Sequence, residues 1–278
     1  MIRPRVVDVL RRGAAARGPG APARGRGAAS RLLWVRSAQS LGQAPVRRQG
    51  GRRVGGHAAA GSGPGEITSD GCAVEFYALL PPMGEPPIVH SAVPAAASIL
   101  ELGCGTGRLL RPLAELGHPV LGVDESQAML ARVPDLPTVC AQIETLRLDR
   151  TFGAVLLAST MINTEPVQRR AFLATCRGHT GPGGLVVIQQ TAHSWFDTAG
   201  PSEREVDGIR RVIRSAHRQG PRVDVVVEYH VGDRMWTHAF SPYEIGEQEL
   251  TADLASAGLR LDRWLTDDRS WFTARPAS

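Results

Sequence analysis

In the middle of the chain, two short apolar runs flank a segment whose apolar residues recur with the period of a helix. Residues 98–102 predict a short buried strand, and residues 106–116 predict the helix that follows it. Residues 118–123 form a second, mostly apolar run that ends at Asp124. Two strands joined by one helix form a βαβ unit, in which the strands are parallel. The pattern therefore predicts an α/β fold with a parallel arrangement of strands in this part of the chain.

The ends of the folded region show other patterns. Toward the C-terminus, apolar and polar positions alternate in short runs between turn residues, which predicts antiparallel strands over 209–217, 222–231 and 234–240. An amphipathic helix over 247–258 and a final pair of strands over 259–265 and 270–275 complete this part. On the N-terminal side, two helices are predicted over 68–80 and 88–93.

Residues 1–65 have low complexity and are rich in Arg, Gly and Ala. They carry 13 arginines against the single acid Asp8, whereas residues 66–278 carry 19 arginines against 26 acids. Such a segment buries too little apolar surface to offset the entropy of ordering. We therefore expect that it is a disordered tail, or that the start codon has been wrongly assigned upstream of the true one. A transit peptide and an RNA-binding Arg-Gly segment are the alternatives.

Composition narrows the class of protein. The folded region, residues 66–278, is mildly acidic, which disfavours a nucleic-acid groove on it. All basic charges are arginine, which is typical of a bacterial genome rich in G and C. The four cysteines are widely spaced without a C-x-x-C pair, so reduced thiols in the cytoplasm are expected, with no metal and no disulfide framework. No apolar run approaches the roughly 18 residues of a membrane-spanning helix.

The turn between the first strand and its helix carries the chemistry. Gly103, Gly105 and Gly107 allow the backbone to approach a ligand and to present its N–H groups. Asp124, at the tip of the second strand, is placed to accept hydrogen bonds from the two hydroxyls of a ribose. A dinucleotide site would have its third glycine at position 108, where this chain has Arg. The ligand should therefore be another nucleoside-bearing molecule.

The run Glu101-x-Gly103-x-Gly105-x-Gly107, followed by Gly122-Val123-Asp124, resembles the first two motifs of class I S-adenosylmethionine-dependent methyltransferases. Residues 141–144, 152–158 and 181–188 resemble the later motifs in the family's order, although Gln142 and Gly153 stand where members often have Asp. The resemblance implies a Rossmann-like seven-stranded sheet with helices on both faces. It also implies an antiparallel insertion over about residues 205–240, after the fifth strand, that covers the active site.

The resemblance further implies where S-adenosylmethionine binds. The glycine loop would hold the methionine end, Asp124 the ribose and the segment around Gln142 the adenine, while the N-terminal helices fold over the cofactor. The implied cofactor residues are Tyr77, Glu101, Gly103, Cys104, Gly105, Gly107, Asp124, Glu125, Met129, Gln142, Ile143 and Ala158.

The acceptor site is expected beside the insertion. Six of the fourteen aromatic residues lie between Trp195 and Tyr243, which suits a flat or cationic acceptor, although sheet packing explains them equally well. Asn163, Trp195, Phe196 and Trp236 are the candidate acceptor contacts. The candidate general bases are His193, Tyr229 and His238. Glu228 should point away from Tyr229, because successive strand residues face opposite sides.

These features predict methyl transfer to a nitrogen or carbon of a small natural product, with an aromatic or indole-bearing acceptor as one option. The alternatives are O-methylation of a phenol or carboxylate, RNA methylation guided by the basic tail, and a cofactor-binding protein without activity. The acceptor is then the only expected partner, and the protein is a monomer or a homodimer.

Overall fold

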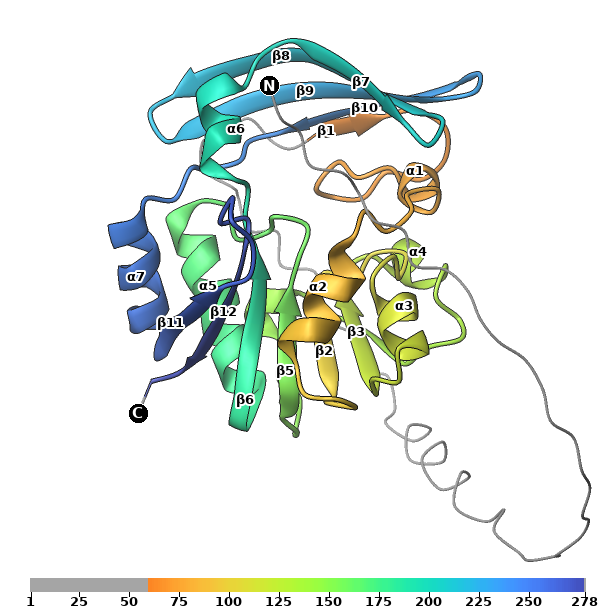
Figure 1. Ribbon diagram of the computed structural model, residues 1–278. Helices are drawn as coiled ribbons and strands as arrows, with labels where there is room; N and C mark the ends of the chain where they lie inside the picture. The colour runs from red at the N-terminus through yellow and green to blue at the C-terminus, as the bar shows by residue number, and fades with distance from the viewer. Residues whose placement is uncertain (1–59, 278) are drawn as a thin grey trace, which may run out of the picture. The chain divides into compact units, whose positions relative to one another are not determined.

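The computed structural model describes residues 60–277, which lie within one compact unit (Figure 1). Most of the tail predicted over 1–65 therefore lies outside the described residues. Two sheets organise the rest. The larger has seven strands in the order β11-β12-β6-β5-β2-β3-β4, and the smaller has five in the order β1-β10-β9-β8-β7. Both the predicted α/β class and the antiparallel insertion after the fifth strand are confirmed.

Five strands of the large sheet are parallel, and they are β2 (Ile99–Leu102), β3 (Val120–Asp124), β4 (Thr138–Cys140), β5 (Phe152–Leu157) and β6 (Thr180–Gln189). The last two are antiparallel, β12 (Trp271–Pro276) pairing with β6 and β11 (Leu259–Trp264) pairing with β12. The strand order reverses at β2, whose neighbours are β3 on one side and β5 on the other. Ligands bind at the carboxyl ends of the strands beside such a reversal.

Helices cover both faces of the large sheet because both faces are apolar. Alternate strand residues such as Ile99 and Leu156 pack with α2 (Glu85–Ala92) and α3 (Leu110–Glu115). Their neighbours, such as Leu100 and Val155, pack with α5 (Pro166–His179) and α7 (Glu247–Ser256). The short α4 (Gln127–Leu130) and a 3-10 turn, η1 (Ile143–Thr145), flank β4. Among residues 60–277, no helix is long and apolar enough to cross a membrane.

The predicted N-terminal helices differ from the observed ones. Residues 68–80 contain only α1 (Val74–Tyr77), and the residues before it form a loop instead. The second helix, α2, begins at Glu85, before the predicted residue 88. Pro86 and Pro87 occupy its first turn, where proline is tolerated because those N–H groups have no partner within the helix.

The small sheet is larger than predicted. The strands β8 (Ile209–Gln219), β9 (Arg222–Val231) and β10 (Arg234–Phe240) match the three predicted runs. The structure adds β7 (Ser202–Val206), which pairs with β8, and β1 (Ala60–Ser62), which pairs with β10. The insertion thus begins at Ser202, before residue 205. Because β1 precedes residue 66, part of the segment predicted as tail belongs to the folded region.

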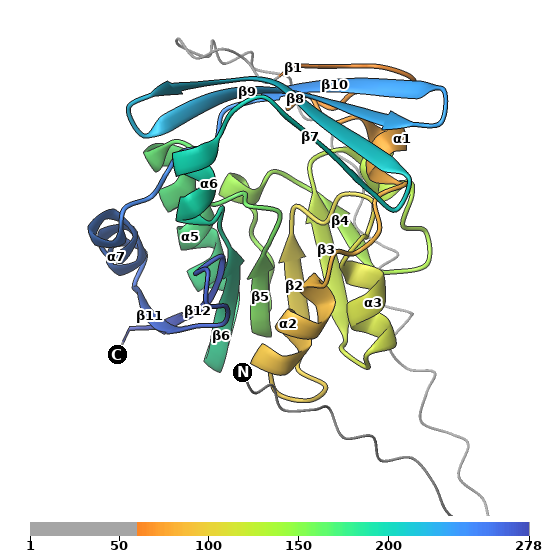
Figure 2. The same cartoon turned by 45° about the horizontal axis from the view of Figure 1, so that its top comes forward.

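This sheet lies over the carboxyl ends of β2, β5 and β6 (Figure 2). Its inner face carries Trp236, Tyr229 and Ile213, which pack against Phe76 of α1 or Phe196 of α6 (His193–Thr198). The small sheet therefore packs on the rest of the fold at two places, α1 and α6. The region where β2 and β5 end is therefore roofed by the antiparallel sheet.

Candidate active site

The glycine loop follows β2 directly. Gly103, Gly105 and Gly107 have φ angles of 71°, 53° and 79°, in the left-handed region that favours glycine. The N–H groups of Gly103 and Cys104 both donate to the carbonyl of Val123, at 2.8 and 2.9 Å. These bonds hold the loop against the end of β3. A Cβ added to Gly105 would meet no atom within 4 Å, so the loop borders open space there.

Asp124 ends β3 beside this loop. One carboxylate oxygen accepts a hydrogen bond from the N–H of Gly105 and the other from the N–H of Ser126, both at 2.9 Å. Burial raises the pKa of the Asp124 carboxyl, and the two N–H groups act against this rise. A carboxylate oxygen can accept more than one hydrogen bond. The group is therefore oriented by the chain and can still accept bonds from ribose hydroxyls.

Glu101 lies under the loop and is only 3% exposed. Among residues 60–277, its Oε2 atom has no hydrogen-bond partner. Burial raises the pKa of Glu101 to about 8, and the nearby Arg108 guanidinium lowers it in part. A buried carboxyl with a free oxygen is suited to a ligand ammonium group. Glu101, the loop and Asp124 together fit the methionine and ribose portions of S-adenosylmethionine.

A polar cluster lies beside Glu101, and its members Glu85, Arg108 and Gln189 were not predicted. Arg108 forms an ion pair with Glu85 at 2.5 Å and donates to Ser159 Oγ at 3.4 Å. The N–H of Ser159 donates to Gln189 Oε1 at 2.7 Å, and Ser159 has a φ of 54°, which is rare for a residue other than glycine. In the sequence, the signal for Arg108 is its place directly after Gly107.

A strap formed by residues 64–77 crosses the cofactor residues. Ser69 Oγ donates to Glu125 Oε1 at 2.5 Å, and Thr106 Oγ1 donates to the carbonyl of Tyr77 at 3.1 Å. Burial raises the pKa of the Tyr77 hydroxyl well above its usual value. The strap thus contacts both the glycine loop and the residue after Asp124.

The other predicted cofactor residues surround Asp124. Met129 is buried on α4, and its N–H donates to Ser126 Oγ at 3.2 Å. Gln142 and Ile143 begin η1, just after Ala141, whose N–H donates to the carbonyl of Asp124 at 3.0 Å. Cys104 and Ala158 are buried at the ends of β2 and β5. These residues come from the four segments that follow β2, β3, β4 and β5, and they all lie at the carboxyl ends of these strands.

Three predicted acceptor contacts are buried instead. Trp236 is 1% exposed, and its Nε1–H donates to the carbonyl of Pro64 at 2.8 Å. Phe196 packs inside the small sheet's core. Asn163 uses its amide to accept from the N–H of Thr191 and to donate to the carbonyl of Tyr243, at 2.6 and 2.8 Å. This burial favours packing and positioning roles for them, and Trp195 alone of the four is half-exposed.

The three candidate bases have different surroundings. His193 starts α6, its side chain is 44% exposed, and its Nδ1 lies 3.4 Å from Glu244 Oε1. Tyr229 stacks on Phe76 with ring centroids 4.1 Å apart, and burial raises the pKa of its hydroxyl. Burial also lowers the pKa of His238, whose Nε2 lies 3.3 Å from the carbonyl of Asp70. His193 is the most accessible of the three. Glu228 faces the opposite side from Tyr229 and contacts Arg214, as predicted.

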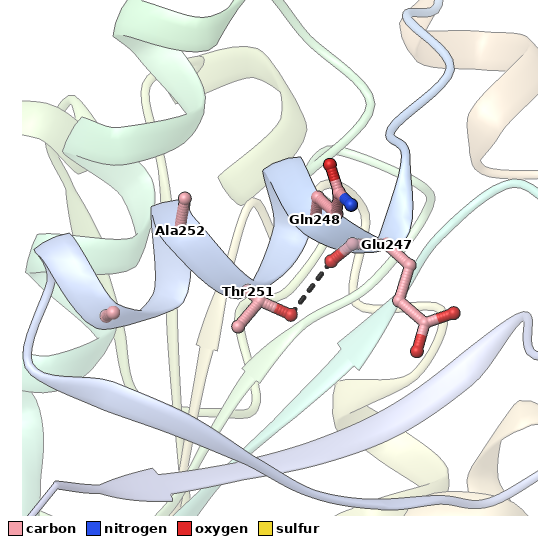
Figure 3. Close-up of a pocket in the computed structure, with 5 residues that line it drawn as sticks. Glu247, Gln248, Thr251 and Ala252 are labelled. Carbon is pink, nitrogen blue, oxygen red and sulfur yellow. Dashed lines mark hydrogen bonds between the residues drawn. The ribbon is translucent and has the colours of Figure 1, made fainter.

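Outside this site, the described residues offer a surface pocket and no metal site. Residues 60–277 include no group of three or more His, Cys, Asp or Glu side chains placed to hold a metal ion. A surface pocket lies on α7 (Figure 3), lined by Glu247, Gln248, Thr251, Ala252 and Ala255. It lies on a helix that packs with α5 and β11, far along the sheet from the glycine loop. The site with the most convergent polar groups is therefore the carboxyl end of β2.

Comparison with known proteins agrees with this site. Residues 99–184 match the methyltransferase domain family. Together with the fold, this match shows that the chain belongs to the class I S-adenosylmethionine-dependent methyltransferases, and S-adenosylmethionine is its cofactor.

Individual relatives are similar over most of their length. The dTDP-4-amino-2,3,4,6-tetradeoxy-D-glucose N,N-dimethyltransferase of Saccharopolyspora spinosa is 27% identical over 198 residues, which cover 63% of this chain and 76% of the relative. The dTDP-3-amino-3,4,6-trideoxy-alpha-D-glucopyranose N,N-dimethyltransferase of Streptomyces venezuelae is 28% identical over 193 residues, covering 63% of this chain and 80% of the relative. Among solved structures, an amino pentose methyltransferase of calicheamicin biosynthesis from Micromonospora echinaspora, with its cofactor bound, is 26% identical. It aligns with a TM-score of 0.54 over 73% of this chain and 92% of its own.

Proposed function

We propose that the protein transfers a methyl group from S-adenosylmethionine to an amino nitrogen of a small natural product. The observation that carries the choice of nitrogen is the similarity to several N-methyltransferases of amino sugars, two of which match over three quarters or more of their length. The antiparallel sheet over the ends of β2 and β5 supports methyl transfer itself, because this reaction is favoured where the protein covers the reactants (Figure 2).

The residues of the chain bind, orient and shield the reactants. S-adenosylmethionine, when bound, would supply a methyl group on a positively charged sulfur, and this sulfur would leave as a neutral thioether when an acceptor nitrogen attacks the methyl carbon. Asp124 would bind the two ribose hydroxyls, and Glu101 with the glycine loop would hold the methionine end. The strap of residues 64–77 would exclude water. His193, next to Glu244, would take a proton from the ammonium form of the acceptor and so free the lone pair that attacks.

An amino sugar is favoured over an indole as the acceptor. The aromatic acceptor was inferred from aromatic residues clustered in the insertion. Trp236 and Phe196 are buried in core clusters, and Tyr229 stacks on Phe76, so little of that aromatic surface remains for a ligand. The relatives that act on amino sugars point the same way.

O-methylation is the second candidate. It is favoured by a ubiquinone biosynthesis O-methyltransferase of Rhodopseudomonas palustris, which is 30% identical over 105 residues. This similarity covers 35% of this chain and 41% of the relative, so it supports the candidate less than the amino-sugar relatives support nitrogen.

The test is an acceptor panel with the purified full chain. Methyl-labelled cofactor is mixed in parallel with free and nucleotide-linked amino sugars, aromatic amines, phenols, small carboxylic acids and RNA, and products are identified by mass spectrometry. We expect label on nitrogen of an amine, with Asp124→Ala as the inactive control. Label on oxygen or carbon only would overturn the proposal in favour of those acceptors. Label in RNA, or cofactor binding with no transfer, would support the two remaining alternatives.

A further inference from the structure

Two arginines face each other on the inner side of the small sheet. Arg204 of β7 lies directly opposite Arg211 of β8 in the strand register. Arg211 is in turn opposite Tyr229 of β9, and Tyr229 is opposite Trp236 of β10. Residues directly opposite each other point to the same face of a sheet. Tyr229 and Trp236 pack on Phe76 below, so both arginines belong to the face that covers the active site.

The arginines on the outer face of the same strands are differently paired. Arg210 forms an ion pair with Glu203 at 3.2 Å, and Arg214 forms one with Glu228 at 2.6 Å. Within residues 60–277, no carboxylate lies within ion-pairing distance of Arg204 or of Arg211. The inner face therefore carries two positive charges side by side that the described part of the chain does not neutralise.

Such a pair is unfavourable unless an anion binds to it. Like charges directly opposite each other on neighbouring strands are destabilising. Arg211 is half-buried and lies near the Tyr229 hydroxyl, whose pKa burial raises and the Arg211 guanidinium lowers in part. A guanidinium binds phosphate or carboxylate through two parallel hydrogen bonds, and two guanidinium groups together can enclose such a group.

The surroundings place this pair next to the reactants. Tyr229 stacks on Phe76, and the next residue, Tyr77, accepts a hydrogen bond from Thr106 of the glycine loop. Tyr229 is also close enough to the Tyr77 hydroxyl to help raise the pKa of Tyr77, to which burial contributes most. The Tyr229 end of this row therefore packs on the strap that contacts the glycine loop, and Arg204 lies exposed at the other end, on the edge strand β7.

We propose that Arg204 and Arg211 bind an anionic group of the acceptor, a phosphate or a carboxylate, and so select acceptors that carry one. This inference rests on the proposed function, because it places the acceptor's charged end under the small sheet while its amine reaches the cofactor. It assigns specificity to β7 and β8.

Binding of anions can be measured without turnover. The full chain, saturated with S-adenosylhomocysteine, is titrated by calorimetry at low salt with inorganic pyrophosphate and, separately, with succinate. We expect one-site binding of at least one probe. Arg211→Gln and Arg204→Gln should each weaken it about ten- to a hundred-fold, the effect of losing a charged hydrogen bond. The matched control, Arg210→Gln, changes an arginine of the same strand on the outer face and should stay within twofold of the wild type.

The outcomes separate the sources of the anion. Binding of pyrophosphate alone indicates a phosphate-bearing acceptor, and binding of succinate alone indicates a carboxylate. Anion binding by the arginines of residues 1–65 would survive both inner-face substitutions, and this result would overturn the proposal. It is equally overturned if neither probe binds, or if Arg210→Gln loses as much affinity as Arg211→Gln. Affinity for S-adenosylhomocysteine should be unchanged in all three variants, which shows that they are folded.

Failure of the proposed function gives a different result. If no amine is methylated in the acceptor panel while pyrophosphate binding still depends on Arg211, the anion site stands and only the reaction must be revised. If an amine is methylated but substitution of Arg204 and Arg211 leaves both anion binding and acceptor KM unchanged, the anion site is wrong and the reaction stands.

Discussion

The backbone N–H of Gly105 donates a hydrogen bond to the carboxylate of Asp124 at 2.9 Å. This contact joins the loop after β2 to the tip of β3, so the two parts of the cofactor site hold each other in place. Since Ser126 donates to the second oxygen, the carboxylate has little rotational freedom left to lose when a ribose binds.

Replacing Asp124 should therefore abolish most of the cofactor affinity. Asp124→Ala removes two charged hydrogen bonds to the ribose and frees the loop, so we expect the Kd for S-adenosylhomocysteine to rise at least a hundred-fold. Asp124→Asn keeps the shape of the side chain, so its Kd for S-adenosylhomocysteine should rise less, by about ten-fold. The control is Asp135→Ala, whose carboxylate is largely exposed and pairs with Arg111. Calorimetry checks this, and equal affinities for Asp124→Ala and wild type would refute the assigned role.

Glu101 should make the stability of the protein depend on pH. Its pKa is raised from 4.5 to about 8 in the folded chain. Between these values the folded state keeps a proton that the unfolded state releases, so the free energy of unfolding falls as pH rises through this window. Glu101→Gln removes this dependence and should be more stable than wild type at pH 9, by about 1–3 kcal/mol.

Chemical denaturation at pH 5 and pH 9 measures this difference. The exposed Glu115→Gln is the matched control and should follow the wild type at both values. A second readout is cofactor binding, which Glu101→Gln should weaken, because the amide lacks the charge that an ammonium group needs. If Glu101→Gln were only as stable as the wild type at pH 9, the prediction that a buried Glu101 carboxylate destabilises the protein there would be wrong.

His193 should matter most where the acceptor amine is protonated. His193→Asn is expected to lower kcat at pH 7 by about ten-fold or more, since a positioned base contributes on this scale. The loss should shrink as pH rises, because the free amine then needs no base. His217→Asn, an exposed histidine on β8, is the control. A pH-independent loss would indicate a positioning role for His193, and no loss at any pH would exclude it as the base.

The boundary of the folded region can be tested by truncation. A chain that begins at residue 60 keeps β1 and the carbonyl of Pro64, to which buried Trp236 donates. A chain that begins at residue 66 loses both and leaves that indole N–H without its acceptor, at a cost of about 1–3 kcal/mol. We expect a lower Tm for the shorter chain by calorimetry, whereas equal Tm values would show that β1 adds nothing. Full activity of the longer one would dismiss RNA methylation guided by the tail.

The residues that could be predicted for the cofactor site lie close together in the sequence and form a recognisable pattern there. Gly103, Gly105 and Gly107 stand within one turn, and Asp124 follows after a single helix and strand. A βαβ unit has one favoured handedness and short connections, so its sequence spacing sets where these groups meet. The same short range made the fold class and most strands of both sheets predictable.

The roles of the aromatic and amide residues depended on partners far along the chain. Trp236 is buried because it reaches the carbonyl of Pro64, and the amide of Asn163 is engaged by Tyr243. No periodicity in the sequence indicates such pairs, since 172 and 80 residues separate them. Burial alone separates an aromatic residue that packs from one that binds a ligand.

The sequence by itself determined the α/β fold, the glycine loop and the carboxylate at the tip of β3, because each arises from neighbours a few residues apart. Only the tertiary structure decided that Arg204 and Arg211 share the inner face of the small sheet with no acid of residues 60–277 paired to them. It also decided that Glu101 is buried with one oxygen unpartnered within the same residues, and that β1 completes the small sheet. These facts depend on strand register and on burial, and both arise only when distant segments pack together.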